Sequence, residues 1–92
     1  MLDPREGAGM AAGPALKNEM FLLEWQGVSS SNVAAVAYSQ DFARLWVRFH
    51  NGGVYTYHSV PESVYSGLVS AASVGGYLAR HVKGSFGYTR VS

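Results

Sequence analysis

The chain has 92 residues, of which 48% are hydrophobic and 14% charged, and its formal net charge is +1. This length fits one domain, and the composition excludes an intrinsically disordered chain. The absence of cysteine excludes disulfides and zinc–thiolate sites, and the small net charge is by itself no argument for nucleic-acid binding.

The N-terminal stretch shows no targeting or membrane signal. The first residues, MLDPRE, carry both signs of charge and lack the basic-then-apolar order of a secretion signal. The apolar run MFLL stops at Glu24, far short of the ~20 residues that a membrane-spanning helix needs. We therefore expect a protein of the cytoplasm, or of a particle assembled there, with no membrane contact.

Residues 1–27 are expected to form an N-terminal arm ahead of a domain at residues 28–92. Residues 1–15 are rich in Gly, Ala and Pro with almost nothing to bury, so they are expected to be flexible in isolation. Residues 16–25 predict a short helix or an edge strand that is too apolar to stay exposed. Docking of this segment is expected through Leu16, Met20, Phe21, Leu23 and Trp25.

Charge is divided unevenly between these two parts. The arm holds four acidic residues against two basic ones, a balance of −2, and residues 28–92 hold five basic residues against two acidic ones, a balance of +3. Each part can meet a partner of opposite sign, or the arm can fold back on the domain.

Three strands are predicted at residues 33–38, 44–49 and 54–58, where β-branched and aromatic residues lie between turn signals. QDFA predicts the first turn and NGG the second, because Asn and Gly tolerate the positive φ of tight hairpins. FGYTRV, at residues 86–91, predicts a last strand or a packed tail.

Two helices are predicted after the third strand. SVPE reads as a capping box in which Ser59 caps the backbone of Glu62, and this helix runs to about Ala71. Ser73 caps a second helix that Gly84 ends. The predicted fold class is therefore α+β, an antiparallel sheet of three to four strands with two helices on one face. The residues expected to be buried are Tyr57, Leu68, Tyr77 and Leu78.

The order of motifs in this chain resembles one known family. The motifs are Ser30-x-Asn32-Val33, Leu45-x-Val47-x-Phe49, Gly53-x-Tyr55-x-Tyr57, Val60-Pro61, Ala71-x-Ser73-x-Gly75, Tyr77 and a closing Tyr88. From Ser29 to about Tyr88 this order is similar to the KTSC domain, a module named for its place at the C-terminus of some lysyl-tRNA synthetases. The module also occurs alone in bacterial and bacteriophage proteins. For this family the resemblance implies RNA binding only by association with the synthetases.

The direction of Tyr55 and Tyr57 depends on the turn before them. A two-residue loop at Asn51-Gly52 places both tyrosines with the arginines of the previous strand, as a platform on which single-stranded nucleic acid stacks. A three-residue loop with a bulge pairs His50 with Val54 and turns both tyrosines into the core. We favour the core arrangement, because two helices must cover one sheet face and this arrangement supplies the larger apolar set.

The core arrangement leaves a smaller aromatic and basic patch on the outer face. Trp46 is the best candidate contact residue, and an equally weighted interpretation is that residues 20–25 of the arm cover it. The candidate binding residues, for protein or nucleic acid, are Trp46, Arg44, Arg48 and His58.

Neither a metal site nor catalysis is predicted. His50 and His58 are separated by ~13 Å around the hairpin at ~3.3 Å per residue, and His81 lies in the apolar stripe of its helix. The acids of residues 28–92 are Asp41 and Glu62, one in a turn and one in a cap, and no serine has a nucleophile elbow. We expect no enzyme activity, no cofactor and no small-molecule substrate.

Two functions remain after these exclusions. The first is a non-catalytic interaction or assembly module, encoded by a phage or prophage, whose arm docks on a protein partner or a neighbouring copy. The alternative is an RNA or single-stranded nucleic-acid binding domain that uses the aromatic and basic sheet face. The low net charge and the apolar segment of the arm favour the first.

Overall fold

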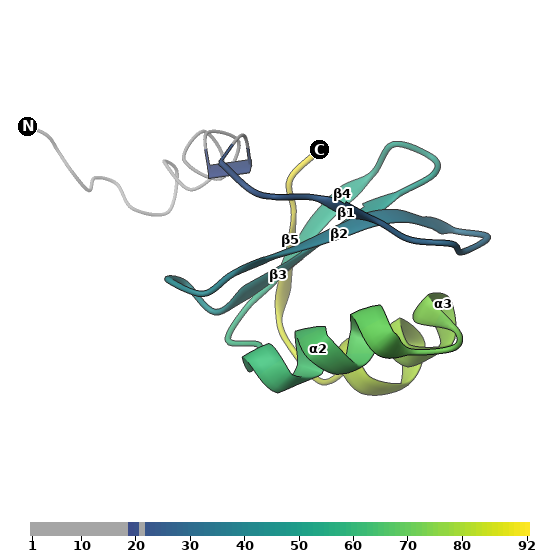
Figure 1. Ribbon diagram of the computed structural model, residues 1–92. Coiled ribbons are helices and arrows are strands. Elements are labelled where there is room, and N and C mark those ends of the chain that lie inside the picture. The colour runs from purple at the N-terminus through teal and green to yellow at the C-terminus, as the bar shows by residue number, and fades with distance from the viewer. Residues whose placement is uncertain (1–18, 21) are drawn as a thin grey trace, which may run out of the picture.

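The computed structural model describes residues 19–20 and 22–92, and within them one antiparallel sheet is the central element (Figure 1). The strands follow one another in the sheet in chain order, so each strand pairs with its neighbours in the sequence. The strands are β1 (Gln26–Gly27), β2 (Val33–Ser39), β3 (Arg44–Phe49), β4 (Val54–Tyr57) and β5 (Tyr88–Arg90).

Helices cover one side of this sheet, and the segment before β1 crosses the other side (Figure 1). Helix α2 spans Glu62–Ser70, and α3 spans Val74–Tyr77 and continues as a π-helical segment, Leu78–Val82. The α+β prediction is confirmed, with five strands rather than three or four because the arm itself contributes β1. No helix in the described part of the chain is long and apolar enough to cross a membrane.

The two helix starts differ in how they are capped. The predicted capping box is wrong: Pro61 is the N-cap of α2 and no side chain caps this helix, because Ser59 turns the chain at φ 57° two residues earlier. The second cap is confirmed, since the Ser73 hydroxyl accepts from the Gly76 N–H at 3.1 Å. Gly84, at φ +83°, follows the end of the π-helical segment as predicted.

A bulge in β2 decides which of its side chains face the helices. The pairing shifts between Val33, which lies opposite Phe49, and Ala35, which lies opposite Arg48. The extra residue breaks the alternation, so Val33 and Val36 both enter the core on the helix side although they are three positions apart.

The hairpin between β3 and β4 closes with a three-residue loop at residues 50–52. The Phe49 N–H donates to the Gly53 carbonyl at 2.9 Å, so the predicted pairing of His50 with Val54 is wrong by two positions. The predicted face is nevertheless correct, because a shift of two residues leaves every side chain on the same side of a sheet. The opposed pairs are Leu45–Tyr57, Trp46–Thr56, Val47–Tyr55 and Arg48–Val54.

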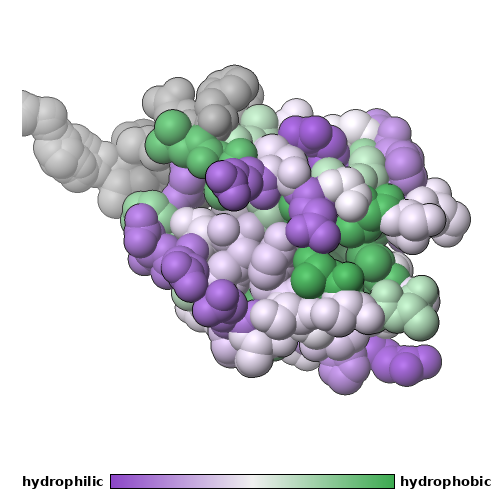
Figure 2. Space-filling view, in the orientation of Figure 1, coloured by the Kyte–Doolittle hydropathy of each residue, from purple (hydrophilic) through white to green (hydrophobic). Residues whose placement is uncertain are grey.

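Two groups of buried residues hold the sheet from opposite sides. Figure 2 shows hydrophobic residues gathering between the sheet and the helices in this view. Burial is confirmed for Tyr57, Leu68 and Leu78, whereas Tyr77 is only half-buried, with its ring beside His81. The helix-side core is formed by Val33, Val36, Leu45, Val47, Tyr57, Val60, Leu68, Val74, Leu78 and Val82. The arm-side core is formed by Ala37, Trp46 and Val54.

Candidate functional site

The predicted contact residue Trp46 lies under the arm. Its exposed fraction is 0%, and Met20, Leu23, Trp25 and Val91 pack against its cluster. The prediction that Trp46 offers an outward contact is therefore wrong for this conformation, and the interpretation that the arm covers it holds. The physical reason is that the apolar arm and the apolar indole both leave water by packing together.

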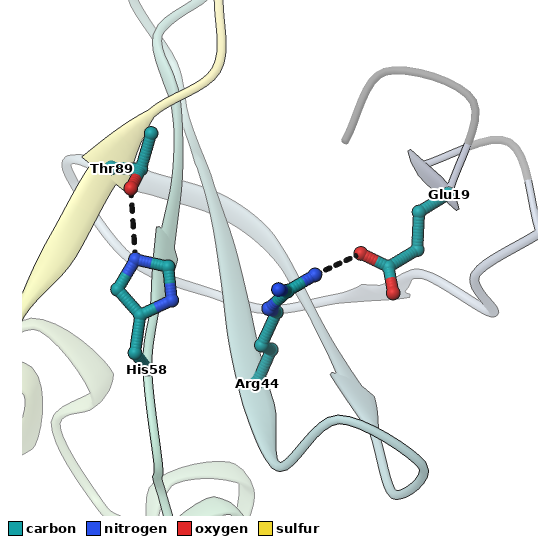
Figure 3. A network of polar contacts seen from close by, with 4 residues as sticks. All are labelled: Glu19, Arg44, His58 and Thr89. Carbon is teal, nitrogen blue, oxygen red and sulfur yellow. Dashed lines mark hydrogen bonds and ion pairs between the residues drawn. The ribbon is translucent and has the colours of Figure 1, made fainter. Parts of the chain in front are cut away.

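Two of the predicted binding residues contact the arm instead of a free surface. Arg44 Nη1 lies 2.7 Å from Glu19 Oε1, and the Arg48 guanidinium lies 4.4 Å from the ring centroid of Trp25 (Figure 3 shows the first pair). Both arginines are half-buried. The described part of the arm, which includes Glu19, therefore folds back on the basic domain, which was one of the two arrangements that the charge distribution allowed.

His58 lies on the same side, after the end of β4. One of its ring nitrogens, Nε2, lies 2.8 Å from the Thr89 hydroxyl of β5 (Figure 3). Burial lowers the pKa of His58, and the positive charge of Arg44 lowers that pKa further. His58 is thus occupied by a structural contact between neighbouring strands.

The predicted docking residues of the arm are only partly described. Met20, Leu23 and Trp25 pack on the chain's own sheet, and Leu16 and Phe21 lie outside the described residues. Leu22 is 85% exposed and takes no part in this packing.

An open cleft lies on the helix side of the sheet, between the β3–β4 hairpin, β5 and the end of the π-helical segment. Its volume is about 630 Å³. We call it the tyrosine cleft, and its main lining residues are Phe49, His50, Tyr55, Tyr57, Lys83 and Tyr88.

Aromatic rings form a continuous surface in the tyrosine cleft. The ring centroid of Tyr88 lies 5.7 Å from that of Tyr55 and 5.9 Å from that of Tyr57, and Phe49 meets Tyr55 edge-on at 5.6 Å. Tyr57 is 4% exposed and Tyr88 is 62% exposed, so the ring surface runs from the core to solvent. Such an arrangement presents flat apolar area at the surface while its base is fixed by the core.

The polar groups of the tyrosine cleft include one positive charge and no carboxylate side chain. Lys83 Nζ lies 5.5 Å from the ring centroid of Phe49, and no Asp or Glu is among the residues that line the cleft. Burial raises the pKa of the Tyr57 phenol, and the neighbouring Tyr55 and Tyr88 raise it further. The phenol therefore stays protonated at neutral pH and can donate.

Sequence reasoning identified Tyr55 and Tyr57 but not the cleft to which they belong. Both face the helix layer, Tyr57 as core and Tyr55 as a half-buried wall. Lys83 and Tyr88 come from the far end of the chain, and only the pairing of β4 with β5 brings Tyr88 opposite Tyr57. The YxY spacing alone carries no signal for these partners.

The histidines lie at three separate places. His50 Nε2 lies 3.0 Å from the Ser30 carbonyl oxygen, and the predicted place of His81 in an apolar stripe is wrong, because its ring is exposed beside Tyr77. The exposure arises because the π-helical winding rotates this part of the helix relative to an α-helical stripe. Within the described residues, no group of three His, Asp or Glu side chains could hold a metal ion.

Comparison with known proteins places most of this fold in one family. The model of the KTSC domain matches residues 29–86. A protein of Tsukamurella paurometabola is 36% identical over 61 residues, which cover 66% of this chain and 91% of that protein. The crystal structure of a KTSC domain protein from Yersinia pestis is similar with a TM-score of 0.73 at 31% identity, covering 76% of this chain and 99% of that chain.

Proposed function

Because this chain belongs to the KTSC domain family and carries the tyrosine cleft, we propose that it is a non-catalytic binding domain that holds part of a partner in this cleft. The observation that carries the proposal is the size and lining of the cleft. At about 630 Å³ it falls within the range of ligand sites, and its aromatic wall with a few polar groups is the usual composition of such sites.

The alternative binding face, around Trp46, is less suited to this role. Its indole is fully buried, and Arg44 and Arg48 are engaged by Glu19 and Trp25. A partner on that face must first displace the arm, whereas the tyrosine cleft is open. We therefore place partner binding at the cleft and regard the described part of the arm as a cover of the domain's own sheet.

The acidic side chains of the domain also support a binding role rather than catalysis. Glu62 Oε1 accepts from the Gln40 side chain at 3.1 Å, and Asp41 lies in the same turn region, beside Phe42. Neither lines the tyrosine cleft. A pair of carboxylates for acid and base catalysis is therefore not placed where a ligand would bind.

A fluorescence titration with anilinonaphthalene sulfonate tests the proposal, since this probe combines flat aromatic rings with one negative charge. We expect saturable binding that Tyr88→Ala weakens and Phe42→Ala does not. Phe42 is a matched control, because it is 57% exposed, compared with 62% for Tyr88, and lies outside the cleft. Equal affinities of the two variants, or no saturable binding, would contradict the proposal.

A further inference from the structure

The chemistry of the cleft lining narrows the class of ligand. We propose that the tyrosine cleft binds one nucleotide, free or as a unit of a single strand, with its base on Tyr88 and its phosphate toward the cations Lys83, which lines the cleft, and Arg90, which lies beside Tyr55. This inference rests on the proposed function, because it takes the tyrosine cleft as the binding site and specifies what fills it.

A base-stacking position is present at Tyr88. The ring is 62% exposed, and the rings of Tyr55 and Tyr57 pack against it at centroid distances of 5.7 and 5.9 Å. An aromatic ring that is fixed on one side and open on the other loses little conformational freedom when a base stacks on it. Bases of any sequence stack on such rings, because each has a π-face.

Two positive charges lie on the rings that adjoin this position, Lys83 on Phe49 and Arg90 on Tyr55. Lys83 Nζ lies 5.5 Å from the ring centroid of Phe49. The Arg90 guanidinium carbon lies 5.7 Å from the ring centroid of Tyr55, which is the ring next to Phe49. Arg90 Nε also donates to the Ser92 carbonyl at 3.1 Å, which fixes the guanidinium beside the aromatic wall. Since no Asp or Glu lines the cleft, its charge is complementary to a phosphate.

An amide donor adds a further recognition group. Asn51 lines the cleft, and its Oδ1 accepts from the Gly53 N–H at 2.9 Å, so its amide –NH₂ is the part left for a ligand. The volume of about 630 Å³ accommodates one nucleotide rather than a long stretch of strand. An acidic peptide would satisfy the cations but would leave the ring of Tyr88 without a flat partner.

The experiment is a titration of the full chain, followed by NMR shifts and tyrosine fluorescence, with uridine monophosphate, short oligouridylate and a polyglutamate peptide. We expect both uridine ligands to bind and the peptide to bind more weakly. Similar affinities of the monophosphate and the oligomer would identify a free nucleotide as the ligand, and clearly tighter binding of the oligomer would identify a single strand. Peptide binding as tight as that of the nucleotides would overturn the inference in favour of an acidic protein partner.

Salt dependence measures how many phosphates are contacted. For single strands the logarithm of affinity falls by about 0.7 for each contacted phosphate per tenfold rise in salt. If the two cations each contact one phosphate, the plot of log affinity against log salt concentration for oligouridylate should have a slope no steeper than about −1.4. A slope several times steeper would place the strand along a larger surface and overturn the assignment to this cleft.

Variants separate the base contact from the phosphate contact. Tyr88→Ala should weaken nucleotide binding about fivefold or more, while Tyr88→Phe should retain it, because stacking depends on the ring. Lys83→Ala should weaken binding and reduce the salt slope, whereas Arg80→Ala, which removes an exposed cation outside the cleft, should change neither. If Lys83→Ala and Arg80→Ala weaken nucleotide binding equally, the binding depends only on the overall positive charge of the protein, and the inference is overturned.

The two proposals fail in different ways. If anilinonaphthalene sulfonate binds in a Tyr88-dependent manner and no nucleotide does, the cleft is a binding site for another ligand and only this inference falls. If neither binds, both the proposed function and this inference fall.

Discussion

The two faces of the sheet are both covered, and they are covered by different means. The helix side is closed by α2, α3 and the π-helical segment over a core of ten buried residues. The arm side is closed by Met20, Leu23 and Trp25 of the arm and by Val91 over three buried residues, Ala37, Trp46 and Val54. The helix side keeps an open cleft at its edge, whereas on the arm side the predicted contact residue Trp46 is completely buried.

This difference shows that the residues that look most like a binding surface in the sequence need not be accessible. Trp46 stands between two arginines, yet it is the largest fully buried side chain of the molecule's described part. Tyr88, in a short tail strand with only Arg90 as a nearby cation in the sequence, is open to solvent and lines the same cleft as Lys83. Accessibility follows from what packs on each face, not from local composition.

Among the changes that test this difference between the two faces, Trp46→Ala is expected to reduce the free energy of unfolding the most. Removing a fully buried aromatic side chain costs about 3–5 kcal/mol, and here it removes the centre of the arm-side core. Urea unfolding measures the loss. Trp46→Phe should cost less, because it keeps an aromatic ring at this position and removes an indole N–H that has no hydrogen-bond partner among the described residues. Similar costs for both variants would contradict this expectation and show that the whole indole, not only an aromatic ring, is required at this position.

Deletion of residues 1–25 should have the next largest effect. It removes the cover of Trp46 and the ion pair to Arg44, and we expect a loss of about 2 kcal/mol, since the burial gain of half-buried side chains is offset by the ordering of the segment. Solubility should fall as the apolar face is exposed.

Deletion of residues 1–18 is the matched control for the arm. It leaves all described contacts of Glu19, Met20, Leu23 and Trp25 in place, so stability by urea unfolding should change little. Unfolding of the domain by this shorter deletion would show that residues 1–18 belong to the fold.

Gly67→Ala tests the packing of the helix side. A Cβ at this position would lie 2.7 Å from Cζ of Tyr77, so α2 and α3 must separate or the ring must move. We expect a net loss of about 1 kcal/mol in thermal or urea unfolding, after the better helix propensity of Ala is counted. In a Tyr77→Ala background the same substitution should be neutral or stabilising. A loss of equal size in both backgrounds would exclude the clash as its cause.

The smallest effect is a pH dependence from His58 on the arm side. Its pKa is lower in the folded chain, mainly through burial and then through Arg44, so the unfolded chain binds more protons below about pH 6.5. The free energy of unfolding should therefore fall as the pH is lowered from about 7 to 5. His58→Gln should flatten this dependence, and His81→Gln, which changes a histidine at an exposed position, is the control. An unchanged slope in His58→Gln would remove His58 as the cause.

The sequence by itself determined the fold class, the three central strands, the two helices and the burial of Tyr57, Leu68 and Leu78. These features depend on local signals, which are apolar alternation, turn residues and helix caps, and such signals act within a few residues. The order of motifs also determined the family. The correct face of Tyr55 followed from the need for a large apolar set on the sheet face that the two helices cover, even though the predicted register was wrong by two residues.

Only the tertiary structure decided which surfaces are open. The bulge in β2, the addition of β1 and the pairing of β5 join residues that are distant in the chain, and no local pattern encodes these contacts. The arm lies on Trp46 because a small domain lowers its free energy by burying the apolar area within reach. Tyr88 comes to lie beside Tyr55 and Tyr57 because strand pairing aligns β5 with β4, and the tyrosine cleft exists only once that pairing has formed.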